Sequence, residues 1–118
     1  MLIKVLKSKI HRATVTDAII DYPGSIGIDS ALMEAAGIVP YELVLVADVT
    51  NGSRLETYVI PEPAGCGKVT ILGAAAKLMK KRDLVIIMGF AYIEPADARH
   101  TKPRVVVVDE KNKIKETV

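Results

Sequence analysis

Short segments rich in β-branched residues recur along the whole chain, and turn-forming residues separate them. In some segments apolar and polar positions alternate, and in others several apolar residues follow one another. Both patterns are typical of β-strands. Helical patterns are short, over residues 31–36, over residues 94–98, and in a segment that begins at Gly73. The expected strands cover residues 1–6, 10–16, 25–28, 43–49, 54–60, 69–72, 84–91, 104–108 and 114–118.

This order of elements predicts a mainly β protein. An open sheet leaves unpaired backbone groups along its edges, so we expect the strands to close into a barrel. A chain of 118 residues without repeats or linkers suits one domain over residues 1–118. The helix over residues 31–36 should be capped by Asp29 or Ser30 and closed by Gly37 in the left-handed conformation.

Alternation along residues 10–16 would place Lys9, His11, Ala13 and Val15 on one face of a strand. Lys9 and His11 would then be neighbours. A lysine at a solvated strand end and a histidine that only supports the fold are the commoner outcomes for such residues. The sequence pattern alone favours those structural roles.

Asn51-Gly52 predicts a type I′ hairpin before the strand over residues 54–60. Alternation in that strand places Arg54 and Tyr58 on one face and Thr57 on the other. A guanidinium beside a phenol can bind a carboxylate. A cross-strand surface pair is the more common use of these residue types.

Composition narrows the function only modestly. The residues are 50% hydrophobic and 25% charged, and the formal net charge is +2. Without a concentrated basic face, no nucleic-acid partner is expected. The single cysteine, Cys66, excludes an internal disulfide and fits a reducing compartment.

No apolar run approaches the ~20 residues of a membrane span. The N-terminal residues also lack the uninterrupted apolar core of a signal peptide. We therefore expect a soluble, cytoplasmic protein with no membrane partner. Two histidines without ligand spacing indicate no metal site.

Gly24-Ser25 carries the candidate chemistry. Pro23-Gly24 is most simply a type II turn in which Gly24 has a positive φ. Alternatively, the Ser25 hydroxyl can attack the Gly24 carbonyl through a five-membered ring, and Gly24 has no Cβ to obstruct it. The resulting ester, lost by elimination, would leave a ketone at a new N-terminus.

Several further stretches occur with Gly24-Ser25 in one order and spacing, and with them the chain resembles the bacterial pyruvoyl-dependent aspartate 1-decarboxylases from Lys4 to about Ile114. These stretches are Lys9-Ile10-His11-Arg12, Tyr22-Pro23-Gly24-Ser25, Thr50-Asn51-Gly52 with Arg54, Thr57-Tyr58, Gly73-Ala74-Ala75-Ala76 and Lys102 to Glu110.

The resemblance implies a double-psi β-barrel that assembles as a homotetramer with active sites between subunits. It also implies self-cleavage into residues 1–24 (the β chain) and 25–118 (the α chain), by way of an ester and dehydroalanine. The product is a covalent pyruvoyl group at position 25. This group forms a Schiff base with L-aspartate and withdraws electrons during decarboxylation to β-alanine, so that neither pyridoxal phosphate nor a metal is needed. The implied pathway is pantothenate and coenzyme A synthesis.

The resemblance also implies roles for single residues. Lys9 and Arg54 would bind the two substrate carboxylates, and Tyr58 would donate a proton. Thr57 would contact substrate and support the oxyanion formed during cleavage. Further substrate-binding residues would be Gly73, Ala74 and Ala75, with His11 and Tyr22 in support.

One position departs from the family pattern. Leu72 stands where the family usually has asparagine, and leucine cannot hydrogen-bond the cleavage loop. We therefore expect slower maturation than in typical members. A maturation protein, as some bacteria use, is compatible with the sequence. Two alternatives stay open: the same chemistry on another acidic amino acid such as glutamate, and an uncleaved barrel that serves as a binding or assembly module.

Overall fold

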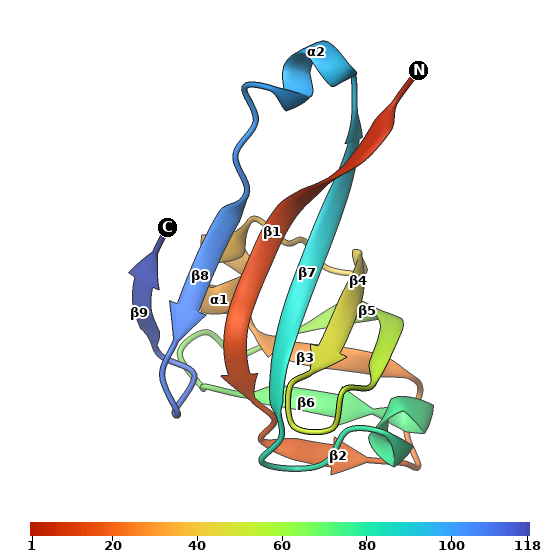
Figure 1. Ribbon diagram of the computed structural model, residues 1–118. Coiled ribbons are helices and arrows are strands. Elements are labelled where there is room, and N and C mark those ends of the chain that lie inside the picture. The colour runs from red at the N-terminus through yellow and green to blue at the C-terminus, as the bar shows by residue number, and fades with distance from the viewer.

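The computed structural model describes residues 1–118 and is mainly β (Figure 1). The predicted mainly β, barrel-like fold is confirmed. Two α-helices, α1 (Ser30–Ala36) and α2 (Pro95–Ala98), and the 3₁₀-helix η1 (Gly73–Lys77) join the strands. The strands are β1 (Ile3–Thr14), β2 (Asp17–Ile19), β3 (Ser25–Asp29), β4 (Leu43–Asp48), β5 (Arg54–Glu62), β6 (Val69–Leu72), β7 (Leu84–Ile93), β8 (Arg104–Val108) and β9 (Ile114–Thr117).

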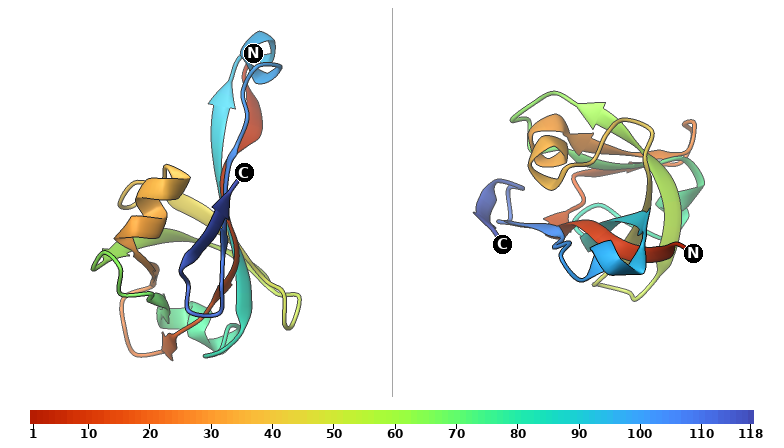
Figure 2. Two further views of the ribbon diagram at one scale, coloured as in Figure 1. Left: turned by 90° about the vertical axis from the view of Figure 1, so that its left-hand side faces the viewer. Right: turned by 90° about the horizontal axis from the view of Figure 1, so that it is seen from above.

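The nine strands follow one another in the order β2-β6-β3-β5-β4-β7-β1-β8-β9. Parallel pairs, such as β3 with β5 and β1 with β8, occur among the antiparallel ones. Seen from above, the strands run around a common centre (Figure 2). Backbone hydrogen bonds from Val15 to Asp83 and from Thr16 to Val69 connect the end of β1 to more distant segments. The enclosed core contains 20 buried hydrophobic residues, and burial of each large aliphatic side chain contributes ~1.5–3 kcal/mol.

The predicted cap of α1 is confirmed. Asp29 accepts a hydrogen bond from Ala31 N–H at 2.9 Å, and Gly37 ends the helix with a φ of 73°. Asp29 also accepts from the N–H groups of Gly65 and Gly67. Burial acts to raise the pKa of Asp29, but these backbone bonds and the charge of Lys113 outweigh it and lower the pKa below its ordinary value. One carboxylate thus holds both the helix and the loop before β6.

The N-terminal region differs from the prediction, because one strand, β1, replaces the expected strands over residues 1–6 and 10–16. The predicted strict alternation is also wrong. The pairing with β7 shifts between Ile10 and Ala13, and Arg12 has a φ of 63°. This β-bulge lets both Ile10 and Ala13 face the core.

The predicted type I′ turn is wrong as well. Among the residues of this hairpin loop only Gly52 has a positive φ, whereas a type I′ turn needs two such residues in succession. Asp48 stabilises the loop instead, because its Oδ1 accepts hydrogen bonds from the N–H groups of Thr50 and Asn51. The Asn51 amide in turn donates to the carbonyl of Leu78, beyond η1.

The first part of β1, the last part of β7 and α2 project beyond the barrel as an arm (Figures 1 and 2). The arm carries exposed apolar side chains, including Leu2 and Tyr92. No helix has the length and apolar character that crossing a membrane would require.

Candidate active site

Ser25 is the first residue of β3 and lies opposite Leu72 of β6. Its side chain is 1% exposed, and its Oγ is buried without a hydrogen-bond partner. Gly24 is not among the glycines with positive φ, so the type II turn with Gly24 in that role is wrong. The chain thus passes from Gly24 directly into strand β3, and the Ser25 hydroxyl is free of hydrogen bonds.

Gly73 brings η1 against this junction. Its φ is 84°, and a Cβ at this position would lie 2.6 Å from Gly24 Cα and 2.9 Å from the Tyr22 carbonyl oxygen. Only glycine permits both this φ and this approach. The backbone that follows Leu72 is therefore in close contact with the candidate cleavage site.

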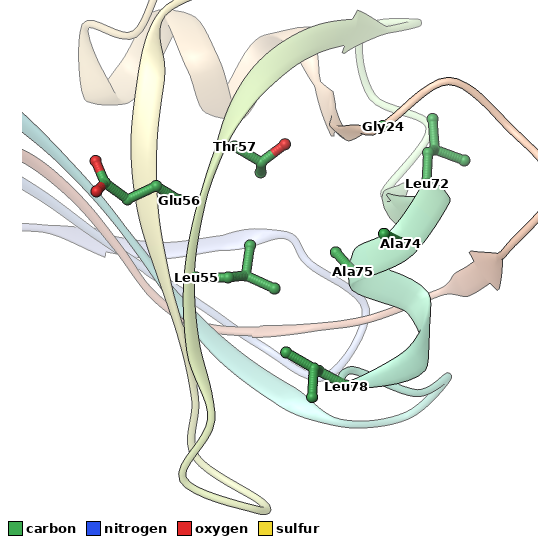
Figure 3. A pocket seen from close by; sticks show the side chains of 8 residues that line it. All are labelled: Gly24, Leu55, Glu56, Thr57, Leu72, Ala74, Ala75 and Leu78. Atoms are coloured by element: carbon green, nitrogen blue, oxygen red, sulfur yellow. The ribbon is translucent and has the colours of Figure 1, made fainter.

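A cavity of about 330 Å³ opens beside the junction. Thr57 of β5 is directed across it toward Gly24 and η1 (Figure 3). Four of the sequence-predicted residues therefore line one cavity: Gly24, Thr57, Ala74 and Ala75. Leu55, Glu56, Leu72 and Leu78 complete the lining, and of these only Leu72 had drawn attention in the sequence.

Tyr58 is placed next to Ser25 by strand pairing. Ile26 lies opposite Val59 in the parallel pair of β3 and β5. One residue earlier, this register brings Ser25 beside Tyr58, on the face opposite to Ile26. Tyr58 is half-buried, and its ring centroid lies 6.3 Å from that of Tyr41.

Lys9 is not brought to the cavity. It pairs with Met88 of β7, and both β7 and β4 separate β1 from β5 in the sheet. Three strand spacings of ~4.8 Å put Lys9 roughly 14 Å from β5 along the sheet. Arg54, at the exposed start of β5, does not line the cavity either, although the next residue, Leu55, does.

His11 and Tyr22 occupy separate surroundings. His11 lies in the bulge of β1 opposite Val107, with its Nδ1 buried and unpartnered. Burial, followed by the charges of Lys9 and Arg12, lowers the pKa of His11 below 6.5, which favours a neutral imidazole. Tyr22 is 53% exposed and borders a second cavity, which Leu72 also lines.

The structure contains no cluster of three or more histidine, cysteine or acidic side chains able to hold a metal ion. The polar groups at the junction are instead hydroxyls: Ser25, Thr57 and Tyr58. Such a set suits acyl transfer and proton transfer better than ligation of a metal.

Comparison with known proteins identifies a family that the chain resembles over nearly its whole length. Residues 1–115 match the family model described as aspartate decarboxylase. A protein of Lactiplantibacillus plantarum named aspartate 1-decarboxylase is 53% identical over 118 residues, which cover all of this chain and 91% of that protein.

Two further proteins carry the same name. The one from Dehalococcoides mccartyi is 56% identical over 93% of this chain and 89% of its own length. The one from Thermosipho africanus is 54% identical over 95% of this chain and 92% of its own length. The chain belongs to the aspartate decarboxylase family.

Proposed function

We propose that this protein decarboxylates L-aspartate to β-alanine and CO₂ after it cuts its own chain between Gly24 and Ser25. The observation that carries the proposal is the buried Ser25 hydroxyl, which has no hydrogen-bond partner and lies beside a cavity at the Gly24 peptide. Membership in the aspartate decarboxylase family supports the choice of reaction. The relatives' names favour aspartate over glutamate and over a non-catalytic barrel.

The first step is internal to the chain. Ser25 Oγ attacks the Gly24 carbonyl carbon, and the chain becomes an ester. The surroundings of Gly24 are open, since a Cβ there would meet, apart from its chain neighbours, only the Leu72 carbonyl oxygen, at 3.9 Å. Thr57 projects from the opposite wall of the cavity and donates to the oxygen on which negative charge develops.

The residues around position 25 also fit a pyruvoyl group made there. No existing hydrogen bond of Ser25 Oγ is lost when the hydroxyl becomes a ketone. That ketone supplies an electron sink for the bond electrons released with CO₂. The substrate position is then enclosed by the Thr57 side chain and by the backbone of Gly73, Ala74 and Ala75.

Charged residues hold the substrate and a phenol completes the reaction. Lys9 and Arg54 bind the two carboxylates of aspartate, because each cationic side chain can pair with one carboxylate. A neighbouring copy supplies Lys9, because two strands, β4 and β7, lie between the chain's own Lys9 and β5. Tyr58, beside Ser25, returns a proton to the substrate carbon that has lost CO₂. His11 and Tyr22 support these groups.

The shared site requires an oligomer with active sites between subunits, and the family resemblance favours a homotetramer. We place this enzyme in the cytoplasm, in pantothenate and coenzyme A synthesis. A maturation protein, where one is present, would act on the cleavage step alone.

An assay of CO₂ release from purified protein tests the proposal. We expect L-aspartate to be converted at least ~10-fold faster than L-glutamate, because a pocket sized for the shorter acid discriminates against one extra methylene by at least about this factor. Ser25→Ala is the control and should release no CO₂. Equal rates on both acids would contradict the substrate assignment, and unchanged activity of Ser25→Ala would contradict the role of Ser25.

A further inference from the structure

Tyr41, in the connection between α1 and β4, has an unusual backbone conformation for an aromatic residue, with a φ of 68°. The Glu42 N–H donates to the Val39 carbonyl at 3.2 Å, so these residues form a β-turn with Pro40 and Tyr41 at its centre. Proline at the first central position and a positive φ at the second are typical of a type II turn, in which glycine or asparagine usually takes the second position. A bulky side chain adopts this conformation only with strain.

Backbone hydrogen bonds hold the turn against β5. The Tyr41 N–H donates to the Val59 carbonyl at 2.8 Å, and the Val59 N–H donates to the Glu42 carbonyl at 3.1 Å. The Glu42 carboxylate also pairs with the Lys7 ammonium at 2.7 Å. Apart from that ion pair these contacts are made by main-chain atoms, so they fix the turn next to Tyr58 whichever side chain residue 41 carries.

The ring of Tyr41 lies against the ring of Tyr58. The two ring centroids are 6.3 Å apart and the ring planes are inclined by 35°, which is within the usual range for a pair of aromatic side chains. Tyr41 is 75% exposed and is not part of the hydrophobic core. Its ring therefore has one described aromatic contact, and that contact is with the proposed proton donor.

From this arrangement we infer that Tyr41 is a positioning residue, whose ring holds the Tyr58 phenol in the orientation that returns a proton to the substrate. The inference rests on the proposed function, in which Tyr58 is the proton donor. A half-buried tyrosine can rotate about two side-chain bonds, and a second ring beside it excludes some of these orientations. A proton donor must lie within ~3 Å of the atom it protonates, so its orientation affects the rate directly.

The strain at residue 41 supports this role. Glycine or asparagine would form the same turn with less strain, so the fold alone does not require a tyrosine here. In the step itself, the Tyr58 O–H bond breaks and a C–H bond forms at the carbon that has lost CO₂, with the electron pair left by that loss. Tyr58 then regains a proton from water. Tyr41 exchanges no proton, so its hydroxyl is not needed.

The test compares wild type, Tyr41→Asn and Tyr41→Phe after self-cleavage, with L-aspartate in excess. Loss of CO₂ comes before return of the proton, so slow proton return leaves the first release of CO₂ from each site fast and slows later turnovers. We expect Tyr41→Asn to show this pattern with turnover slowed ~10-fold, part of the ~100-fold or more that a positioned acid contributes. Tyr41→Phe keeps the ring and should match wild type.

Two further variants serve as controls. Arg82, in the turn before β7, is exposed and has a φ of 80°, so Arg82→Asn relieves the same kind of strain without removing an aromatic contact. Its turnover should equal that of wild type. In a Tyr58→Phe background, Tyr41→Asn should cause no further loss, because a residue that acts through Tyr58 has no effect once the phenol is absent.

Turnover at the wild-type rate by Tyr41→Asn would overturn the inference. A first release of CO₂ that is slowed as much as later turnovers would also overturn it, since the ring would then affect binding or folding. The same holds if Tyr41→Phe is as slow as Tyr41→Asn. If Tyr58→Phe turns over like wild type, or if the chain never cleaves, the proposed function itself fails.

Discussion

At the scale of single residues, Gly73 is the most constrained position at the candidate site. Its positive φ and its contact with Gly24 both exclude a side chain. We expect Gly73→Ala to move η1 away from the junction and to slow self-cleavage at least ~10-fold, since displacement of ~1 Å near reacting groups can cost ~100-fold. Intact mass against time measures this. Gly65→Ala, at an open position of similar φ, is the control for backbone strain, and equal effects of the two substitutions would contradict the contact argument.

For Leu72, both the sequence and the structure raise the question of whether a leucine at this position slows self-cleavage. It faces Ser25 across the β3–β6 pair, 7% exposed, and offers no hydrogen bond to the unpartnered hydroxyl. We expect Leu72→Asn to cleave several-fold faster than wild type, because an amide can hydrogen-bond the cleavage loop. Leu72→Met is the control for changed packing. Equal cleavage rates of Leu72→Asn and wild type would show that this side chain has no part in processing.

The sequence identified Gly24, Ser25, Thr57 and the alanines after Gly73 because their motifs are local. It did not identify Leu55 and Leu78, which also line the cavity. Their place there depends on how β5 packs beside η1, and no local motif indicates that packing.

At the scale of elements, the loop between β4 and β5 depends on a carboxyl pair. Asp48 Oδ1 accepts two backbone hydrogen bonds, whereas its buried Oδ2 has no donor and lies beside the carboxyl of Asp83. Burial raises the pKa of Asp48 above its ordinary value of 3.8, and the neighbouring carboxyl of Asp83, with which a protonated Asp48 can share its proton, adds to this. Protonation of Asp48 thus favours the folded state.

This gives a pH-dependent prediction. A raised folded-state pKa contributes stability that is fully present below the unfolded value and is lost as the pH rises through the folded value. Asp48→Asn keeps the acceptor oxygen and can donate to Asp83 at every pH. The melting temperature of Asp48→Asn should therefore rise relative to that of wild type as the pH increases from about 4 through the raised pKa of Asp48. A difference that stays constant over this range would contradict the carboxyl pair.

Most elements could be predicted from hydrophobic spacing, including α1 with its Asp29 cap and Gly37 end. The exceptions have particular causes. The bulge at Arg12 resets the alternation in β1, and arginine has no preference for positive φ that would mark the position in the sequence. In the hairpin loop, the Asp48 carboxylate accepts hydrogen bonds from the N–H groups of Thr50 and Asn51, and the Asn-Gly dipeptide alone does not indicate this turn geometry.

At the scale of the whole molecule, the separation of Lys9 from the cavity predicts a site shared between copies. Lys9→Ala lacks a substrate-binding cation, and Ser25→Ala cannot form the ketone, so each alone should be inactive. Co-assembled from an equal mixture, they should recover about a quarter of wild-type activity, because some sites then combine intact Ser25 with intact Lys9 from different copies. Mixing after separate assembly is the control. No recovery in a verified mixed oligomer would place Lys9 and Ser25 of one chain in one site.

The central claim concerns the bond between Gly24 and Ser25, and intact mass of the purified wild-type protein tests it most directly. We predict two fragments, residues 1–24 and 25–118. The larger fragment should have lost the serine amine and should gain the mass of one hydrazide probe that traps a ketone. A folded chain that remains intact and unlabelled, yet releases CO₂ from aspartate, would contradict the account.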